Sequence, residues 1–185
     1  MNFIRKIFKK AGNEIYIGEK ISQIQHMAQT AQLAEKAGFN KQVIVGSFLH
    51  DIGHLLPRRM SPRMEYDDQD LGVLDHELVG EQICIRAGLP KLTTDIIKNH
   101  VNAKRYLVSS QTYLTNLSDA SYKTLKLQGG KMSDHEMTTF EKEIAFHIFI
   151  HVRKWEEQAK DPDIVISQQD IDRYFTMTEQ LIQKY

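Results

Sequence analysis

Four histidines and one aspartate stand out in this sequence because their types and spacing suit a metal centre. His50 and Asp51 are adjacent inside an otherwise apolar run, and a carboxylate seldom lies in a protein core unless it is paired or binds a metal. His26 lies 24 residues before His50, and His76 and His100 follow Asp51 by 25 and 49 residues. Together these side chains are numerous enough to hold two metal ions. Imidazole and carboxylate groups without thiolates suit iron, manganese, zinc or cobalt rather than copper(I) or an iron–sulfur cluster.

The elements that must position these residues are predicted to be helices separated by short breaks. Apolar residues recur at helical spacing, and strand-like alternation is almost absent. The predicted helices cover residues 20–37, 41–56, 75–87, 93–107, 119–127, 133–159 and 167–184. A further helix at the N-terminus is expected to place Phe3, Ile4, Ile7 and Phe8 on the core. The sequence therefore predicts an all-α helical bundle.

Local signals support several of these boundaries. Pro57 ends the helix at 41–56, which is apolar on all sides as a central buried helix would be. Ser133 and Glu136 have the spacing of a capping box and should open the helix at 133–159. Residues 57–74 form the one long polar stretch without a clear pattern, and we expect an irregular loop there.

Length and composition indicate a single globular domain over residues 1–185. The chain is 41% hydrophobic and 26% charged with a net charge of zero, so no nucleic-acid partner is expected. The single cysteine, Cys84, excludes an intramolecular disulfide and fits a reducing compartment. No apolar run is long enough to span a membrane, and the N-terminus lacks the features of a secretory signal. We therefore expect a cytoplasmic protein without a membrane partner.

The order His, His-Asp, His, His in a helical chain resembles the HD-domain superfamily, and the match holds at every one of those positions. Most members of that superfamily hydrolyse phosphate esters, and a minority use dioxygen. Three further segments, at residues 13–19, 117–130 and 152–160, together with the helix at 100–107, are similar to the HD-domain mixed-valent diiron oxygenases that cleave carbon–phosphorus bonds. The resemblance covers the chain from about residue 15 to residue 160 and implies an HD-domain helical bundle.

The resemblance implies two iron ions held by six side chains. His26 and His50 would bind one iron, His76 and His100 the other, and Asp51 would bridge them with one oxygen on each. The family's sixth ligand is an aspartate, and the matching position here is Glu156. A glutamate is one methylene longer, so it can still reach the metal with an altered geometry.

The resemblance also implies a set of substrate-binding residues. Tyr16 would cap one iron until substrate displaces it, and Glu19 would meet the ammonium group of the substrate. The phosphonate dianion would bind a cation and hydrogen-bond donors. These would come from His54, Lys104, Ser121 and Thr124.

The implied reaction converts 2-amino-1-hydroxyethylphosphonate and dioxygen to glycine and phosphate, with no reductase partner. One alternative is a metal-dependent phosphohydrolase acting on a nucleotide or another phosphomonoester, in which the metals would activate water; metal identity and oxygen uptake would separate the two. The segment Tyr16–Glu19 and the run Gln128-Gly129-Gly130 favour the oxygenase. A second alternative, a helical binding module without activity, is disfavoured by the complete set of histidines and Asp51. N-methylated amines, another chain length or a non-phosphonate alcohol remain open as substrates.

Overall fold

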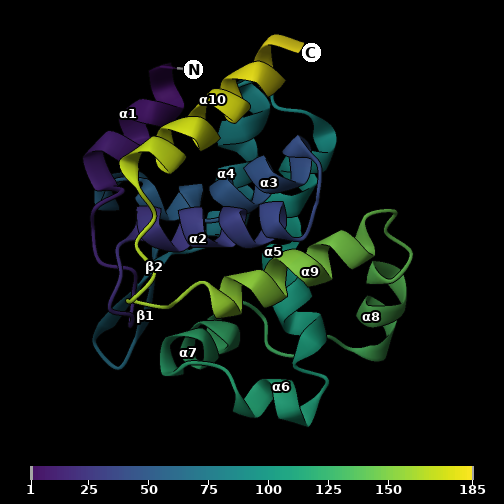
Figure 1. The fold of residues 1–185 in the computed structure, drawn as a ribbon. Helices are drawn as coiled ribbons and strands as arrows, with labels where there is room; N and C mark the ends of the chain where they lie inside the picture. Colours follow the sequence, from purple (N-terminus) through teal and green to yellow (C-terminus); the bar gives the residue numbers. More distant parts are fainter. Residues whose placement is uncertain (1, 185) are drawn as a thin grey trace.

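The periodic hydrophobic pattern of the chain forms a bundle of helices in the computed structural model, which describes residues 2–184 (Figure 1). The elements are α1 (Asn2–Ala11), α2 (Gln23–Lys36), α3 (Lys41–Leu49), η1 (Ile52–Leu55), η2 (Arg58–Met60), β1 (Arg63–Tyr66), β2 (Gln69–Val73), α4 (His76–Arg86), α5 (Lys91–Leu107), α6 (Gln111–Thr115), α7 (Asp119–Leu127), α8 (Asp134–Phe140), α9 (Phe146–Gln158) and α10 (Gln168–Lys184). The prediction of an all-α fold is confirmed, since the described residues contain only one two-stranded sheet. None of the described helices has the length and apolar character needed to cross a membrane.

Helix α3 is the centre of the bundle, with every residue from 43 to 49 buried. It packs against α2, α5 and α10, while α9 covers α2 and α5. The rings of Phe8, Phe48 and Phe175 contact one another at centroid distances of 5.1–5.2 Å and join α1, α3 and α10. The predicted inward face of α1 is confirmed for Ile4, Ile7 and Phe8, but Phe3 is 57% exposed, so its placement on the core was wrong.

The helix predicted at 41–56 is broken after Leu49, which corrects that prediction. Asp51 leaves helical geometry at φ −100° and ψ 11°, and the short helix η1 follows. A side chain at Gly53 would clash with the backbone oxygen of His76. The absence of a Cβ at Gly53 therefore lets η1 lie directly against the start of α4. The break brings Asp51 next to His76, which a continuous helix would not do.

The prediction of an irregular loop at 57–74 was also wrong, because residues 63–73 form an antiparallel hairpin of β1 and β2. Asp67 and Asp68 form its turn with φ angles of 48° and 61°. Two consecutive positive φ angles are typical of the two-residue turns that suit the twist of a hairpin. The side chain of Arg63 pairs with Asp70 at 2.9 Å across the two strands.

The long helix predicted at 133–159 is divided into α8 and α9. The capping box at Ser133 is present, with both of its reciprocal hydrogen bonds, and α7 and α10 lie where they were predicted. The turn at 141–145 lets the rings of Phe140 and Phe146 meet at a centroid distance of 5.4 Å. On one continuous helix these two side chains would point about 120° apart, so aromatic packing favours the break. The short helix α6 had not been predicted.

Candidate metal centre

Four helical segments that are distant in the sequence bring the predicted metal ligands together. His26 lies on α2, His50 follows α3, Asp51 precedes η1, His76 opens α4 and His100 lies on α5. All five residues are at most 3% exposed. Such complete burial of a carboxylate and four imidazoles requires compensating partners.

The two oxygens of Asp51 divide the histidines into two pairs. Oδ2 lies 3.7 Å from Nε2 of His26 and 3.4 Å from Nε2 of His50. Oδ1 lies 3.5 Å from Nε2 of His76 and 3.4 Å from Nε2 of His100. Each oxygen and its pair of nitrogens form a group of three atoms within 4.8 Å of one another, a size that can hold a metal ion.

The second ring nitrogens show which atoms are free to bind a cation. The Nδ1 atoms of His26, His50 and His100 lie 2.7–2.8 Å from backbone carbonyl oxygens. Those carbonyls belong to Ala159, Ser47 and Ile97, respectively. A carbonyl only accepts, so each Nδ1 carries the hydrogen and each Nε2 of the neutral ring presents a lone pair.

The distances between the Nε2 atoms test whether a metal ion fits. Nε2 of His26 lies 3.2 Å from Nε2 of His50, and the corresponding distance between His76 and His100 is 3.0 Å. Two ring nitrogens this close to each other and to a carboxylate oxygen need a proton or a metal ion between them. The donor set therefore fits a metal ion in each group, and oxygen and nitrogen donors of this kind suit iron.

Ionisation behaviour agrees with this interpretation. Burial, followed by the nearby His50, lowers the pKa of His26 to about 3. Burial and His54 likewise lower the pKa of His76 well below its usual value. Burial opposes charge on His50, but the Asp51 carboxylate outweighs it and raises the pKa of His50 to about 9. Asp51 thus favours a positive charge at His50, which a metal ion bound at Nε2 would supply in place of a proton.

Glu156 lies beside the centre on α9 but does not belong to either group of ligand atoms. One carboxylate oxygen, Oε1, pairs with the guanidinium of Arg153, and Oε2 has no hydrogen-bond partner in the described part of the chain. Burial opposes ionisation of Glu156, but Arg153, followed by His100 and His50, lowers its pKa to about 2. The carboxylate is thus ionised and has one oxygen available.

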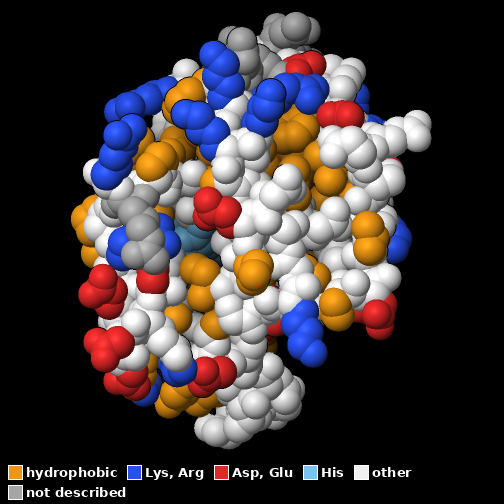
Figure 2. Space-filling model, turned by 90° about the vertical axis from the view of Figure 1, so that its left-hand side faces the viewer, with side chains coloured by type: hydrophobic (Ala, Val, Ile, Leu, Met, Phe, Trp, Pro, Cys, Tyr) orange, Lys and Arg blue, Asp and Glu red, His pale blue; other side chains and the backbone are white. Residues whose placement is uncertain are grey.

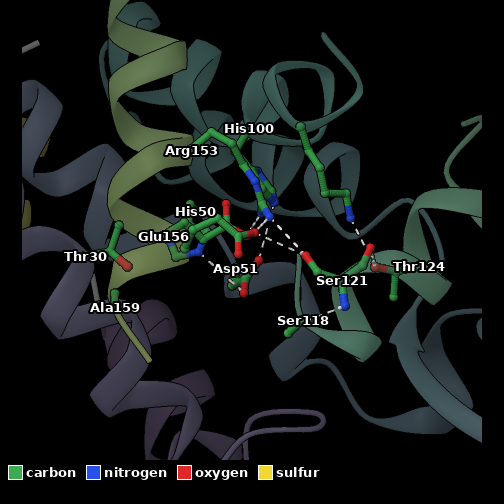
Figure 3. A network of polar contacts seen from close by, with 12 residues as sticks. Thr30, His50, Asp51, His100, Ser118, Ser121, Thr124, Arg153, Glu156 and Ala159 are labelled. Carbon is green, nitrogen blue, oxygen red and sulfur yellow. Dashed lines mark hydrogen bonds and ion pairs between the residues drawn. The ribbon is translucent and has the colours of Figure 1, made fainter. Parts of the chain in front are cut away.

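Arg153 is a residue of the site that the sequence interpretation missed. Its side chain is 2% exposed and pairs with both Glu156 and Glu157. It also donates to Ser121 Oγ at 3.0 Å and to Tyr113 Oη at 2.9 Å. Figure 3 shows Arg153 and Glu156 reaching from α9 toward Asp51, with Ser121 facing them from α7. The spacing of Arg153 three and four residues before two glutamates was the available signal.

A small cavity of about 50 Å³ opens beside Asp51. Its volume corresponds to a few water-sized sites, so it suits a small ligand. All six side chains predicted to bind substrate line it, namely Tyr16, Glu19, His54, Lys104, Ser121 and Thr124.

One end of the cavity is arranged for an anion. Lys104 is 3% exposed and donates to Thr124 Oγ1 at 3.1 Å. Burial, followed by the Arg153 guanidinium, lowers the pKa of Lys104 to about 7. Lys104 and the hydroxyls of Ser121 and Thr124 thus line the cavity together, next to the guanidinium of Arg153, which is already paired with two glutamates. Groups of these kinds recognise phosphate-like dianions.

The turn at residues 16–19 also lines the cavity. The ring of Tyr16 lies flat on the His26 imidazole, with a centroid distance of 3.9 Å and an interplanar angle of 11°. The carboxylate of Glu19 pairs with Lys160 at 3.3 Å, and Lys160 pairs equally with Glu157 at 3.3 Å. Glu19 is therefore already neutralised by a lysine, which the sequence interpretation had not foreseen.

His54 and Ile17 form a wall between the cavity and a larger groove of about 660 Å³ on the face shown in Figure 2, since both residues line both spaces. The ring of His54 stacks on His76 with a centroid distance of 3.8 Å. Its Nδ1 accepts from the backbone N–H of Val73 at 3.0 Å. Burial lowers the pKa of His54 to about 4, so the neutral ring carries its hydrogen on Nε2.

Comparisons with known proteins agree with this geometry. The family model described as HD domain matches residues 24–177. An uncharacterized protein, L432, from Acanthamoeba polyphaga mimivirus is 40% identical over 86% of this chain and 72% of its own length. The [1-hydroxy-2-(trimethylamino)ethyl]phosphonate dioxygenase (glycine-betaine-forming) of Leisingera caerulea is 36% identical over 100% of this chain and 91% of its own length. The hydroxymethylphosphonate dioxygenase of Gimesia maris is 32% identical over 96% of this chain and 86% of its own length. The chain thus belongs to the HD-domain family and, within it, to the phosphonate dioxygenases, which are oxidoreductases.

Proposed function

We propose that this protein is a diiron oxygenase that cleaves the carbon–phosphorus bond of a 1-hydroxyphosphonate, with 2-amino-1-hydroxyethylphosphonate as its preferred substrate. The observation that supports the dinuclear site is the position of Asp51, whose two oxygens each face a separate pair of histidine nitrogens at 3.4–3.7 Å. Glu156, with one unpartnered buried oxygen, is the proposed sixth ligand.

The two relatives support the class of substrate. The names of the Leisingera and Gimesia proteins both describe a phosphonate with a hydroxyl on the carbon that carries phosphorus. They differ in the group beyond that carbon, which is absent in hydroxymethylphosphonate and is a methylene carrying a trimethylamino group in the other compound. We infer that the shared part binds near the metals and the anionic end, while the turn at 16–19 selects the remaining group.

The chain's own residues bind and orient this substrate. Protonated Lys104 donates to a phosphonate oxygen, with the hydroxyls of Ser121 and Thr124 and the Nε2–H of His54 as further donors. The same cation neutralises the phosphate as it leaves. Glu19 accepts from the substrate ammonium, and Lys160 keeps its second partner, Glu157, when Glu19 turns to the ligand. The Tyr16 ring covers the His26 side of the centre and limits the access of water.

The reaction balances without an external reductant. Bound iron would supply the binding and reduction of dioxygen beside C1. The C1–H and C1–P bonds break, both atoms of dioxygen enter the products, and the substrate provides all four electrons. Glycine, inorganic phosphate and one proton result. No reductase is therefore required as a partner.

The test combines metal analysis with product analysis. Anaerobically purified protein should contain about two irons per chain, and partial oxidation should produce a coupled iron(II)–iron(III) electron paramagnetic resonance signal that changes when substrate binds. Oxygen uptake and phosphate release should match one to one. Hydroxymethylphosphonate and the trimethylamino compound serve as comparison substrates, and a phosphomonoester tests hydrolysis. Phosphate release from the ester without oxygen uptake, or an active zinc-only protein, would overturn the proposal.

A further inference from the structure

His76 differs from the other three histidines of the centre in the environment of its second ring nitrogen. The other three place Nδ1 against a neutral backbone carbonyl at 2.7–2.8 Å. Nδ1 of His76 has no hydrogen-bond partner in the described part of the chain. Its nearest charged neighbour is a carboxylate oxygen, Oε2 of Glu77, at 3.6 Å.

Glu77 is placed to accept that hydrogen. It is the second residue of α4, and its side chain is 14% exposed. Its Oε2 atom also has no hydrogen-bond partner among the described residues. A buried donor and a buried acceptor that both lack partners are costly, and closing their separation by about half an ångström would satisfy both.

The His76 ring has little freedom to find another partner. It stacks on the His54 ring with an interplanar angle of 18°, and His54 is itself held by the backbone of Val73. At the ring edge, Nε2 of His76 faces Asp51 and His100. With one face and Nε2 occupied, the Glu77 carboxylate at 3.6 Å is the acceptor that Nδ1–H can reach.

We propose that Glu77 is a positioning residue for the metal position formed by Asp51, His76 and His100, and that it makes the two metal positions unequal. A carboxylate that accepts from a ligating imidazole fixes the ring and strengthens its donor nitrogen. The position formed by His26 and His50 has only neutral carbonyls in that role. The inference rests on the metal-binding part of the proposed function and concerns which ion is held more tightly.

Metal loss from the loaded protein tests this role. The wild-type protein, Glu77→Ala and Glu77→Gln are incubated with increasing chelator, and the metals retained are counted by mass spectrometry. Loss of a second-sphere partner typically weakens metal binding by about 10- to 100-fold. Glu77→Ala should therefore release one of its two ions at about 10- to 100-fold lower chelator, while the other is retained as in the wild type. Glu77→Gln should release that ion at a chelator concentration between those of the wild type and Glu77→Ala, because its amide oxygen accepts a hydrogen bond without carrying a charge.

Glu81→Gln is the matched control. Glu81 lies one turn further along α4, has a side chain 13% exposed and pairs with Lys98 at 3.5 Å, so its loss should leave both ions in place. A redox titration separates an effect of the charge from an effect on the structure. In iron-loaded Glu77→Gln the one-electron reduction potential should rise, because a negative charge near one ion is removed. Wild-type-like retention in both Glu77 variants, parallel loss of both ions, or equal loss in Glu81→Gln would overturn the proposal.

The two proposals fail in different ways. If the wild-type protein takes up no oxygen with any phosphonate, the proposed function is wrong, and the zinc-loaded protein still reports the effect of Glu77 on retention. If Glu77→Ala does not fold, the Glu77→Gln comparison decides the question.

Discussion

Replacing Arg153 with glutamine should destabilise the protein strongly, and the loss should depend on whether metal is bound. The guanidinium is 2% exposed and neutralises Glu156, whose side chain is 6% exposed. Removing one partner of such a buried ion pair costs about 3–5 kcal/mol, because the remaining charge is left unpaired. Glu157 contributes less to the loss, since it keeps Lys160 as a partner.

The size of the effect can be converted to a melting temperature. For a chain of this length each kcal/mol corresponds to roughly 2–4 °C, so metal-free Arg153→Gln should melt about 6–20 °C below the metal-free wild-type protein. In the loaded protein the unpaired oxygens of Glu156 gain a cation, and the difference should shrink. Thermal unfolding of both proteins, each with and without metal, measures these four values.

A double variant provides the control. In Arg153→Gln combined with Glu156→Gln no buried charge is left alone at this pair, so much of the lost stability should return in the metal-free protein. If the single variant melts within about 1 °C of the wild type, or if the double variant is no more stable than the single one, the buried ion pair is not what holds α9 at the centre.

Three further predictions concern charged residues of the cavity, and a fourth concerns the pH dependence of kcat/KM. Asp51→Asn should lower metal content and turnover more than replacement of any single histidine, because it removes charge from both positions at once; retention of two irons and normal turnover would show that Asp51 does not bridge. Glu156→Ala should lose one iron preferentially and Glu156→Asp should retain it, whereas Glu157→Ala should retain both metals; the reverse order, measured by iron analysis, would move the ligand by one residue. Glu19→Ala should weaken binding of the amine-bearing substrate by roughly 1–3 kcal/mol, or about 5- to 150-fold, and scarcely change that of hydroxymethylphosphonate; equal losses on both would refute recognition of the amine. Because burial lowers the pKa of Lys104 to about 7, the charge that attracts the phosphonate is present below that pH and lost above it, so kcat/KM should fall as pH rises through about 7, and Lys104→Met should be lower with a flatter profile.

Many local features of this protein are determined by short stretches of sequence. Ser22, Asn40, Ser118 and Ser133 accept backbone N–H groups at the starts of α2, α3, α7 and α8. Capping depends on residues within one turn of each other, which is why the capping box at Ser133 could be predicted from the sequence. The identities and order of the histidines and Asp51 were likewise readable, because a buried carboxylate among apolar residues already indicates a metal or an ion pair.

The tertiary structure alone decided how these residues are arranged. The break after Leu49 depends on Gly53 packing against the backbone of His76, and the division of α8 from α9 depends on ring contacts that a sequence period does not reveal. The same holds for the hydrogen bond between His26 and Ala159, which are 133 residues apart. Arg153 was not among the predicted site residues, although packing places it beside the centre at 2% exposure. Backbone and capping preferences act over a few residues, whereas the sharing of the two Asp51 oxygens between histidine pairs requires several helices to be packed at once.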